Sequence, residues 1–398
     1  MGRLRNKTGL FFLEGMNSFA TVYYFYYLYF FMHRVHGFHS KANLELAALN
    51  GLVCMISSWG GGKFCQRFGY FLSLKVGFTL MIASLAVGLT VHSALGQVLV
   101  MVGTTLGMGF TWPSLEALVS HGEEPTRLPR ILGIYNVVWA AAGALAYFTG
   151  GAMLDRLGTS SLFYVPMLLL CGELALAFWL ERQTTIVEPA LASSDAAGTL
   201  SELEANTRPI AKAKMFLRMA WLANPFAYIA INTVVAVIPD IASHLGLSTT
   251  SAGFYCSVWC FARMAAFFAL RSWDGWHYKF RWLVLAYLAL LGTFATILLV
   301  PHLWTLVLAQ LLFGLALGLI YYSSLFYSMD SSDTQGEHGG IHEAAIGLGN
   351  FAGPAVGAAS LHFLPQAPNS SAIAVSGLLV IGFGGLVAIR SWSKWHPA

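Results

Sequence analysis

An arginine inside an apolar stretch is the residue of this chain best placed to do chemistry. Arg263 lies in the stretch 251–271, eight residues from its nearer end, which is about 12 Å along a helix. At that depth a side chain does not easily reach water, so the guanidinium should face a cavity or a carboxylate. Arg263 could therefore bind an anion, take part in proton coupling or form a structural ion pair.

Four carboxyl groups are candidate partners for this arginine and candidate proton carriers. They stand in or at the ends of apolar stretches and are Glu14, Glu116, Asp240 and Glu343. Burial disfavours the charged form of a carboxyl group, so such a group can take up and release a proton at working pH. We expect Glu14 first, and Glu343 second, to carry a coupling proton. For the last three of the four, a solvated position at a helix end is an equal alternative.

Aromatic and amide side chains could line a cavity around these charges. Only one face of each helix can see such a cavity, and packing between helices or at the lipid interface is the alternative for each aromatic residue. Together they indicate a cavity that stacks on and hydrogen-bonds an amphipathic organic molecule. The candidates for substrate contact are Asn17, Tyr24, Tyr27, Trp112, Asn136, Trp139, Asn232, Arg263, Tyr321, Tyr322 and Asn350.

Two groups of histidines have spacings that could bind a metal: His33, His36 and His39, and the pair His338 and His342 beside Glu343. The pair would share one helix face, but two glycines separate its members and should interrupt a helix. We expect solvated loop histidines, no metal and no cofactor. The chain also lacks the GxxxxGK[ST] phosphate-binding motif, so the sequence carries no sign of an activity driven by ATP.

The elements that must position these residues are twelve apolar stretches. Of 398 residues, 57% are hydrophobic and 10% charged, and the mean hydropathy is +0.64, whereas a soluble domain carries about 25% charged residues. Each stretch can cross a bilayer core, which takes about 20 residues per helix, and must be helical to pair its backbone groups. The predicted spans are 9–32, 43–65, 72–92, 97–119, 131–153, 161–181, 215–239, 251–271, 281–300, 303–328, 342–363 and 372–390.

A single polar connector splits the spans six and six. We expect an N-terminal bundle over 1–181, a cytoplasmic linker over 182–214 and a C-terminal bundle over 215–398. The halves resemble each other at an offset of about 207 to 210 residues, as in Asn17 with Asn224 and Gly109 with Gly318. This repeat indicates a duplicated structure with a site between the halves.

The basic residues predict the orientation. With the N-terminus in the cytoplasm, Arg34, Lys41 and Arg156 fall outside, Arg263 lies within a span, and the other Lys and Arg residues, of 22 in all, fall inside. The positive-inside rule therefore predicts that both termini are cytoplasmic. The first stretch is too long for the core of a signal peptide. The net charge of +4 sits at span ends and gives no reason to expect nucleic acid.

Two segments carry a recognisable motif, G-x-x-x-D-[RK]-x-G. A degraded copy follows the second span, with Gln66 in place of the acid, and a fuller copy follows the fifth span. With the six-plus-six layout, these segments resemble the major facilitator superfamily (MFS). The resemblance implies an all-α polytopic membrane protein with twelve transmembrane helices in two pseudo-symmetric six-helix bundles. It also implies that the motifs act as a conformational latch, here Gly62, Gln66, Arg67, Gly69, Asp155 and Arg156.

The function that follows is secondary active transport, not catalysis. We expect alternating access to move a small organic anion or amphipathic aromatic compound across the cytoplasmic (inner) membrane, with proton coupling. The expected partners are this solute, protons or another ion, and the bilayer, and we expect a monomer. A lipid or lysolipid transporter of the same fold, or a membrane enzyme that uses His338, His342 and Glu343, are the alternatives. Substrate identity, direction, and symport, antiport or uniport stay open.

Overall fold

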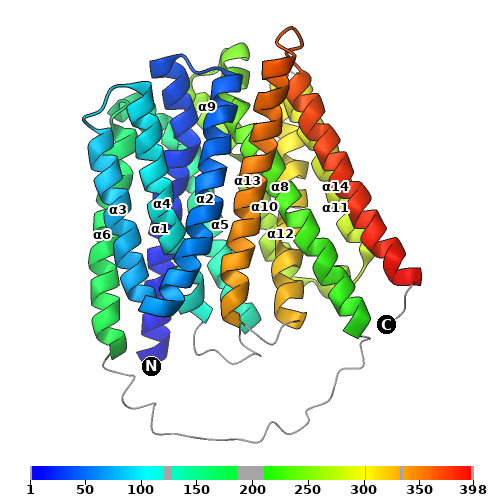
Figure 1. The fold of residues 1–398 in the computed structure, drawn as a ribbon, viewed down its shortest axis with the longest axis horizontal. Coiled ribbons are helices and arrows are strands. Elements are labelled where there is room, and N and C mark those ends of the chain that lie inside the picture. The colour runs from blue at the N-terminus through cyan, green and yellow to red at the C-terminus, as the bar shows by residue number, and fades with distance from the viewer. Residues whose placement is uncertain (1, 121–127, 186–209, 301, 332–334, 396–398) are drawn as a thin grey trace, which may run out of the picture.

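The computed structural model of the chain is helical (Figure 1). It describes residues 2–120, 128–185, 210–300, 302–331 and 335–395, and the side chains of 7–120, 130–183, 212–300, 302–327 and 344–392. Within these residues the only regular elements are α-helices and one short 3-10 helix. The prediction of an all-α chain is confirmed.

Six helices form the N-terminal half. They are α1 (Gly2–His36), α2 (Ser40–Phe68), α3 (Tyr70–Gly88), α4 (Ala94–Ser120), α5 (Leu128–Leu157) and α6 (Ser161–Thr185). Each contains one of the six predicted spans or its greater part.

The C-terminal half repeats this pattern with one interruption. Its helices are α8 (Ile210–His244), α9 (Thr249–Cys256), α10 (Val258–Ser272), α11 (Phe280–Leu299), α12 (Leu303–Ser331), α13 (Gln335–Phe363) and α14 (Ser370–Trp395), with the 3-10 helix η1 (Asp274–Trp276) after α10. Helices α9 and α10 together make one span, Thr249–Ser272. The described helices thus supply the twelve predicted spans.

Ten of these spans are apolar enough to cross a membrane by composition alone, in the part of the chain that the structure describes. Helices α1 and α2 are long enough but more polar. Their polar side chains point inward: Glu14, Asn17 and Ser18 of α1 and Asn43 and Ser57 of α2 are all buried. The two helices therefore place hydrogen-bonding groups inside the bundle and not against lipid.

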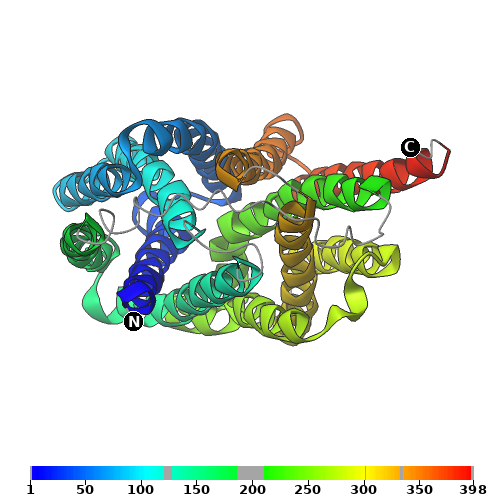
Figure 2. The same ribbon diagram turned by 90° about the horizontal axis from the view of Figure 1, so that it is seen from below.

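The two halves are duplicates in their helix lengths as well as their order. Helices α1 and α8, the first of each half, are both 35 residues long. Seen from below, α1 to α6, coloured blue to dark green, form one bundle and α8 to α14, coloured light green to red, form the other, and α2 and α5 of the first bundle lie against α13, α9 and α10 of the second (Figure 2). The two pseudo-symmetric bundles that the sequence predicts are confirmed.

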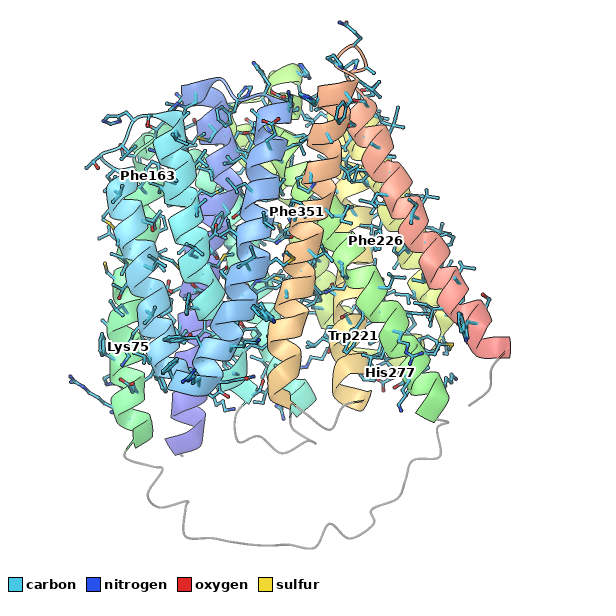
Figure 3. The ribbon with its side chains drawn as sticks, in the orientation of Figure 1. Lys75, Phe163, Trp221, Phe226, His277 and Phe351 are labelled. Carbon is cyan, nitrogen blue, oxygen red and sulfur yellow. The ribbon has the colours of Figure 1, made fainter. Side chains whose placement is uncertain are left out.

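Glycines let the halves touch backbone to backbone. A Cβ on Gly51 of α2 would lie 2.3 Å from the carbonyl carbon of Asn350 on α13, and Figure 3 labels the next residue, Phe351, beside this contact. A Cβ on Gly151 of α5 would lie 2.2 Å from the carbonyl oxygen of Thr249 on α9. The α2–α13 and α5–α9 contacts are therefore the closest-packed seams between the halves.

The bundle has two distinct ends. Helix α1 begins and α14 ends at one of them, which we call the terminal end (Figure 1). Helix α1 ends at His36 and α2 begins at Ser40 at the other, which we call the distal end. The predicted cytoplasmic side is the terminal end, and the predicted outer side is the distal end.

Candidate functional site

Arg263 lies on α10 in a stripe of large aromatic side chains. Trp259, Arg263 and Phe267 follow at intervals of four residues, so they share one helix face. All three are buried, and Arg263 is 5% exposed. Its guanidinium carbon lies 4.9 Å from the centre of the Trp259 ring, which is within the range of a cation–π interaction.

The opposite half supplies a second ring for the same cation. Trp139 of α5 lies 4.3 Å from the guanidinium carbon of Arg263. Its ring stacks on Tyr321 of α12 with 5.5 Å between centroids and 17° between planes, and on Phe267 at 6.4 Å and 25°. We call Trp139, Trp259, Arg263, Phe267 and Tyr321 the aromatic cluster, which spans both halves.

The charge of Arg263 is not balanced by a carboxylate of the described side chains. None of the ion pairs among them includes this residue, and its buried Nε has no hydrogen-bond partner there. Burying an unpaired charge is costly, and the two tryptophan rings offset only part of that cost. The cluster is therefore electrostatically suited to receive an anion.

Two amides lie near the cluster in the C-terminal half. Asn232 of α8 donates a hydrogen bond through Nδ2 to Oδ1 of Asn350 on α13, and the same nitrogen lies 3.3 Å from the carbonyl oxygen of Tyr228. The Tyr228 ring is 6.5 Å from that of Tyr321. Tyr228 therefore connects the predicted amides Asn232 and Asn350 to the predicted Tyr321.

Three predicted residues of the N-terminal half carry buried polar atoms without a partner in the described part of the chain. They are both amide atoms of Asn17, Nδ2 of Asn136 and Nε1 of Trp112. Buried polar groups normally bond to protein, water or ligand, so these atoms are suited to hydrogen-bond a polar solute.

The tyrosines predicted from α1 are not brought to the aromatic cluster. Tyr24 packs on Phe163 of α6, with centroids 6.3 Å apart, and the Tyr27 hydroxyl donates to the carbonyl oxygen of Tyr147. Their neighbour Tyr26 instead stacks on Trp259 at 6.2 Å. Tyr26, which lies between the two selected tyrosines and was not selected, is therefore the tyrosine of α1 that contacts the aromatic cluster.

Tyr322 of α12 lies at the edge of the cluster. Its ring is 6.0 Å from that of Phe267 and 5.9 Å from that of Trp276 in η1. Phe267, which we did not select, could have been found from its spacing of four residues after Arg263.

Glu14 of α1 is connected to α5 through Tyr135. It is fully buried, and its two oxygens accept from the hydroxyls of Ser18, at 2.7 Å, and Tyr135, at 2.9 Å. Tyr135 is one turn before Trp139 on α5. A path of side chains thus runs from Glu14 through Tyr135 toward the aromatic cluster.

The other predicted carboxyl groups lie elsewhere. Glu116 is partly buried near the end of α4, and Asp240 is near the distal end of α8. The side chain of Glu343, with those of His338 and His342, lies outside the described residues. Glu173 of α6, which we did not select, is fully buried with both carboxyl oxygens lacking a described partner.

The fuller motif copy lies at the distal end and joins the halves. Asp155 accepts hydrogen bonds from the backbone nitrogen of Thr250 at 2.9 Å and from its hydroxyl at 2.8 Å, in the first turn of α9. It also pairs with Arg34 of α1 at 3.2 Å. A carboxylate at a helix N-terminus is favoured by the exposed N–H groups and the helix dipole.

The degraded copy lies at the terminal end. Gln66, Arg67 and Gly69 are exposed, whereas Gly62 is buried. Gly69 has a φ of +97° and links α2 to α3. Arg156, the basic residue of the fuller copy, is exposed next to Asp155.

Two six-helix halves with a polar and aromatic cluster between them define the fold of a membrane transporter. The family model described as Major Facilitator Superfamily matches residues 98–354, and the chain belongs to this superfamily. A comparison with curated protein sequences found no match.

Solved transporter structures share the fold at low sequence identity. The human organic anion transporter MFSD10 (TETRAN) is 15% identical, with 96% of this chain and 99% of that chain covered and a TM-score of 0.65. A variant of the nucleoside transporter NupG is 11% identical, with coverages of 96% and 99% and a TM-score of 0.69. A variant of the peptide transporter POT is 15% identical, with coverages of 97% and 94% and a TM-score of 0.69.

Proposed function

We propose that the protein is a proton-coupled secondary transporter of small organic anions that carry an aromatic or other flat apolar group. The observation that carries this proposal is Arg263, a buried cation between two tryptophan rings without a carboxylate partner in the described part of the chain. A carboxylate or phosphate of the substrate would complete this site with charge-assisted hydrogen bonds.

The rest of the substrate would be recognised by the surroundings of Arg263. Trp139 and Tyr321, both partly buried, stack on each other, and a flat apolar group of the substrate would pack against the accessible part of this ring pair. The paired amides of Asn232 and Asn350 offer further hydrogen bonds in the same half as Tyr321. A molecule with one anionic end and one aromatic end matches this distribution.

Alternating access fits the way in which the halves meet. The substrate site takes Trp139 from one half and Arg263 from the other, so rocking of the halves would open and close it. At the distal end, Asp155 joins α5 to α9 and Asp240 joins α8 to α2. We propose that these contacts close the distal, outer side and must break when the site opens there.

Glu14 is the proposed proton carrier. Its carboxyl group is buried and receives two hydroxyl contacts but no cation among the described residues. An uncompensated charge is costly in such a place, so Glu14 would be protonated in one state of the cycle and release the proton in another. Tyr135 would connect this event to Trp139, one turn further along α5.

The membrane assignment completes the proposal. The terminal end would face the cytoplasm in the inner membrane, the protein would act as a monomer, and it would carry out no catalysis. The predicted domain boundaries, 1–181, 182–214 and 215–398, would separate two rigid bundles by a tether.

A binding measurement on purified protein tests the site. A panel of organic anions, with neutral analogues of the same shape, is screened by thermal shift, because a ligand stabilises the state that it binds. We expect an aromatic anion to raise the midpoint in the wild type and in Arg281→Gln, which removes an exposed arginine, but not in Arg263→Gln. Equal shifts in all three proteins, or equal shifts by the neutral analogues, would contradict the proposal.

A further inference from the structure

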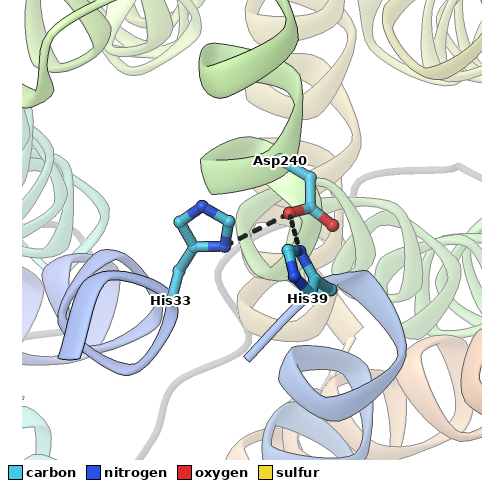
Figure 4. Close-up of side chains that lie close together, drawn as sticks. All are labelled: His33, His39 and Asp240. Carbon is cyan, nitrogen blue, oxygen red and sulfur yellow. Dashed lines mark hydrogen bonds and ion pairs between the residues drawn. The ribbon is translucent and has the colours of Figure 1, made fainter. Parts of the chain in front are cut away.

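Two histidines and one aspartate from different halves converge at the distal end (Figure 4). Nδ1 of His33 and Nδ1 of His39 each lie 3.2 Å from Oδ1 of Asp240, and the three donor atoms are within 4.8 Å of one another. We propose that His33, His39 and Asp240 form a site for Zn²⁺ or a similar divalent transition metal, and that the bound ion fastens the two halves together.

The local backbone explains why two histidines that are six residues apart meet. Helix α1 ends at His36, three residues after His33, and Gly37 takes a left-handed φ of +67°. The chain then reverses: the Gly37 nitrogen donates to the carbonyl oxygen of His33, which is the pairing of a helix that ends in a left-handed glycine, and the Phe38 nitrogen donates to the carbonyl oxygen of Met32. The two imidazole rings end 5.2 Å apart. We expected solvated loop histidines here, but His33 is instead part of α1 and half-buried.

The donor set and its dimensions suit zinc. Two imidazole nitrogens and one carboxylate oxygen are ligands that zinc prefers, with water in a fourth position. Metal–ligand distances of about 2.0–2.2 Å in a tetrahedron place neighbouring donors about 3.3 Å apart. Both N–O separations in the cluster already have nearly this length, so only the distance between the two histidine nitrogens would need to adjust.

Asp240 is held in the orientation that a metal ligand needs. Its Oδ2 accepts hydrogen bonds from the backbone nitrogen and the hydroxyl of Ser40, so that Oδ1 is left facing the two imidazoles. Partners of this kind fix the ligand and raise metal affinity. His33 has a competing contact, because its Nδ1 lies 2.9 Å from the Phe38 carbonyl oxygen, and metal binding would break it.

The basic residues near His33, His39 and Asp240 have partners other than Asp240. Lys41 contacts Glu45 and His362, and Arg34 pairs with Asp155. Within the described side chains, the two histidines are therefore the only basic groups in ion-pair contact with Asp240. The His39 side chain is 79% exposed, so an ion can reach the site from the distal face.

The consequence of metal binding rests on the proposed alternating access. His33 and His39 belong to the N-terminal half and Asp240 to the C-terminal half, so the ion would bridge α1 and α8 across the distal closure. A bridged closure cannot open, and Zn²⁺ added on that side should inhibit transport. The binding site itself does not depend on the transport proposal.

Calorimetric titration of Zn²⁺ into untagged, chelator-treated protein tests the site, with Mg²⁺ as the comparison ion. We expect one zinc ion per chain, at least about tenfold weaker binding in His33→Gln and in His39→Gln, and wild-type affinity in His92→Gln, which removes an exposed histidine. His39→Gln alters an exposed side chain and should leave the fold intact. Equal zinc affinity in the wild type and both ligand variants would overturn the proposal.

A second measurement tests the bridge between the halves. In proteoliposomes, external Zn²⁺ should inhibit substrate uptake by the wild type and by His92→Gln but not by His39→Gln. Zinc binding without inhibition would overturn the locking role and leave the metal site standing. If no substrate is transported at all, the calorimetric result still decides the site, so failure of the transport proposal is distinguishable from failure of this one.

Discussion

Arg263 and Trp139 come from different halves of the bundle, yet the guanidinium carbon of one lies 4.3 Å from the ring centre of the other. An arginine at a domain seam is commonly held by a carboxylate, which neutralises it. Here the ring face holds the guanidinium through its quadrupole and leaves the net positive charge in place. In the proposed function the contact would orient the cation for a ligand, and it links Arg263 to the relative position of the halves.

Replacing Trp139 should weaken binding of an aromatic anion more than it weakens the fold. Trp139→Leu removes a cation–π contact and a stacking face worth about 1–2 kcal/mol together, so the dissociation constant should rise about five- to thirtyfold. Trp139→Phe keeps a ring and should have a smaller effect. Calorimetry with the ligand found by thermal shift measures both values. Trp304→Leu, which removes a tryptophan that is 63% exposed, is the control, and an equal loss of affinity there would refute a specific role for Trp139.

Arg263→Lys separates charge from shape. A lysine keeps the positive charge but lacks the planar guanidinium that stacks between two rings and binds a carboxylate through two N–H groups. We expect the variant to bind the anion about tenfold more weakly than the wild type, and more tightly than Arg263→Gln. Competition binding with one labelled ligand gives the ranking. If lysine and glutamine are equivalent, the site does not act through charge.

Glu14→Gln should remove the response of transport to a proton gradient. Glutamine keeps the polar contacts with Ser18 and Tyr135 but cannot exchange a proton. Any change in uptake therefore reports the loss of proton exchange at this residue and not the loss of these contacts. In proteoliposomes, an imposed pH gradient should stimulate uptake by the wild type and by Glu45→Gln, which changes an exposed carboxylate, but not by Glu14→Gln. Counterflow exchange of substrate, which needs no net proton movement, should persist in Glu14→Gln. Equal stimulation in all three proteins would show that another group carries the proton.

Much of the fold could be predicted because bilayer physics constrains it. Apolar length predicts the helices, and their number and repeat predict the two halves. The position of Arg263 predicted an inward-facing side chain for the same reason, since a charge deep in a span must avoid lipid and face the bundle interior. Helices α1 and α2 were found by length although they are the most polar spans, because their inward polar residues are interrupted by aromatic and aliphatic ones.

The site was only partly predictable because contacts across the seam depend on helix rotation and approach. On α1 it is Tyr26, and not the selected Tyr24 or Tyr27, that stacks on Trp259, since adjacent positions differ by about 100° around a helix. The meeting of His33 with His39 needed the turn at Gly37, and that of Asp240 with Ser40 needed the halves to be docked. The spacing of the residues along the sequence predicts neither the geometry of this turn nor the way in which the halves dock.

Asp155→Asn should make the distal end open more readily. Asparagine keeps the size of the side chain but loses the negative charge that faces the start of α9 and Arg34. A charge at a helix N-terminus is worth about 0.3–1 kcal/mol, so the population open at the distal end should rise about two- to fivefold. Maleimide labelling of the buried Cys256 of α9, in a variant without the other cysteines, measures this population. Arg281→Gln, which changes an exposed arginine at the terminal end of the bundle, should label like the parent, and unchanged labelling of Asp155→Asn would contradict a latch at this residue.

Gly51→Ala should destabilise the seam between the halves, because α2 has no room there for a methyl group. The new Cβ would lie 2.3 Å from backbone atoms of Asn350 and Phe351 on α13, which a side-chain rotation cannot relieve, so the helices must separate. Overpacking of this kind costs about 1–3 kcal/mol. Gly60→Ala, on the same helix, places its methyl group where nothing lies within 4 Å. Both changes gain the same helix propensity, so the difference between their thermal midpoints isolates the contact. We expect Gly51→Ala to unfold at the lower temperature; equal midpoints would mean that α2 and α13 are not in contact at this point in the membrane.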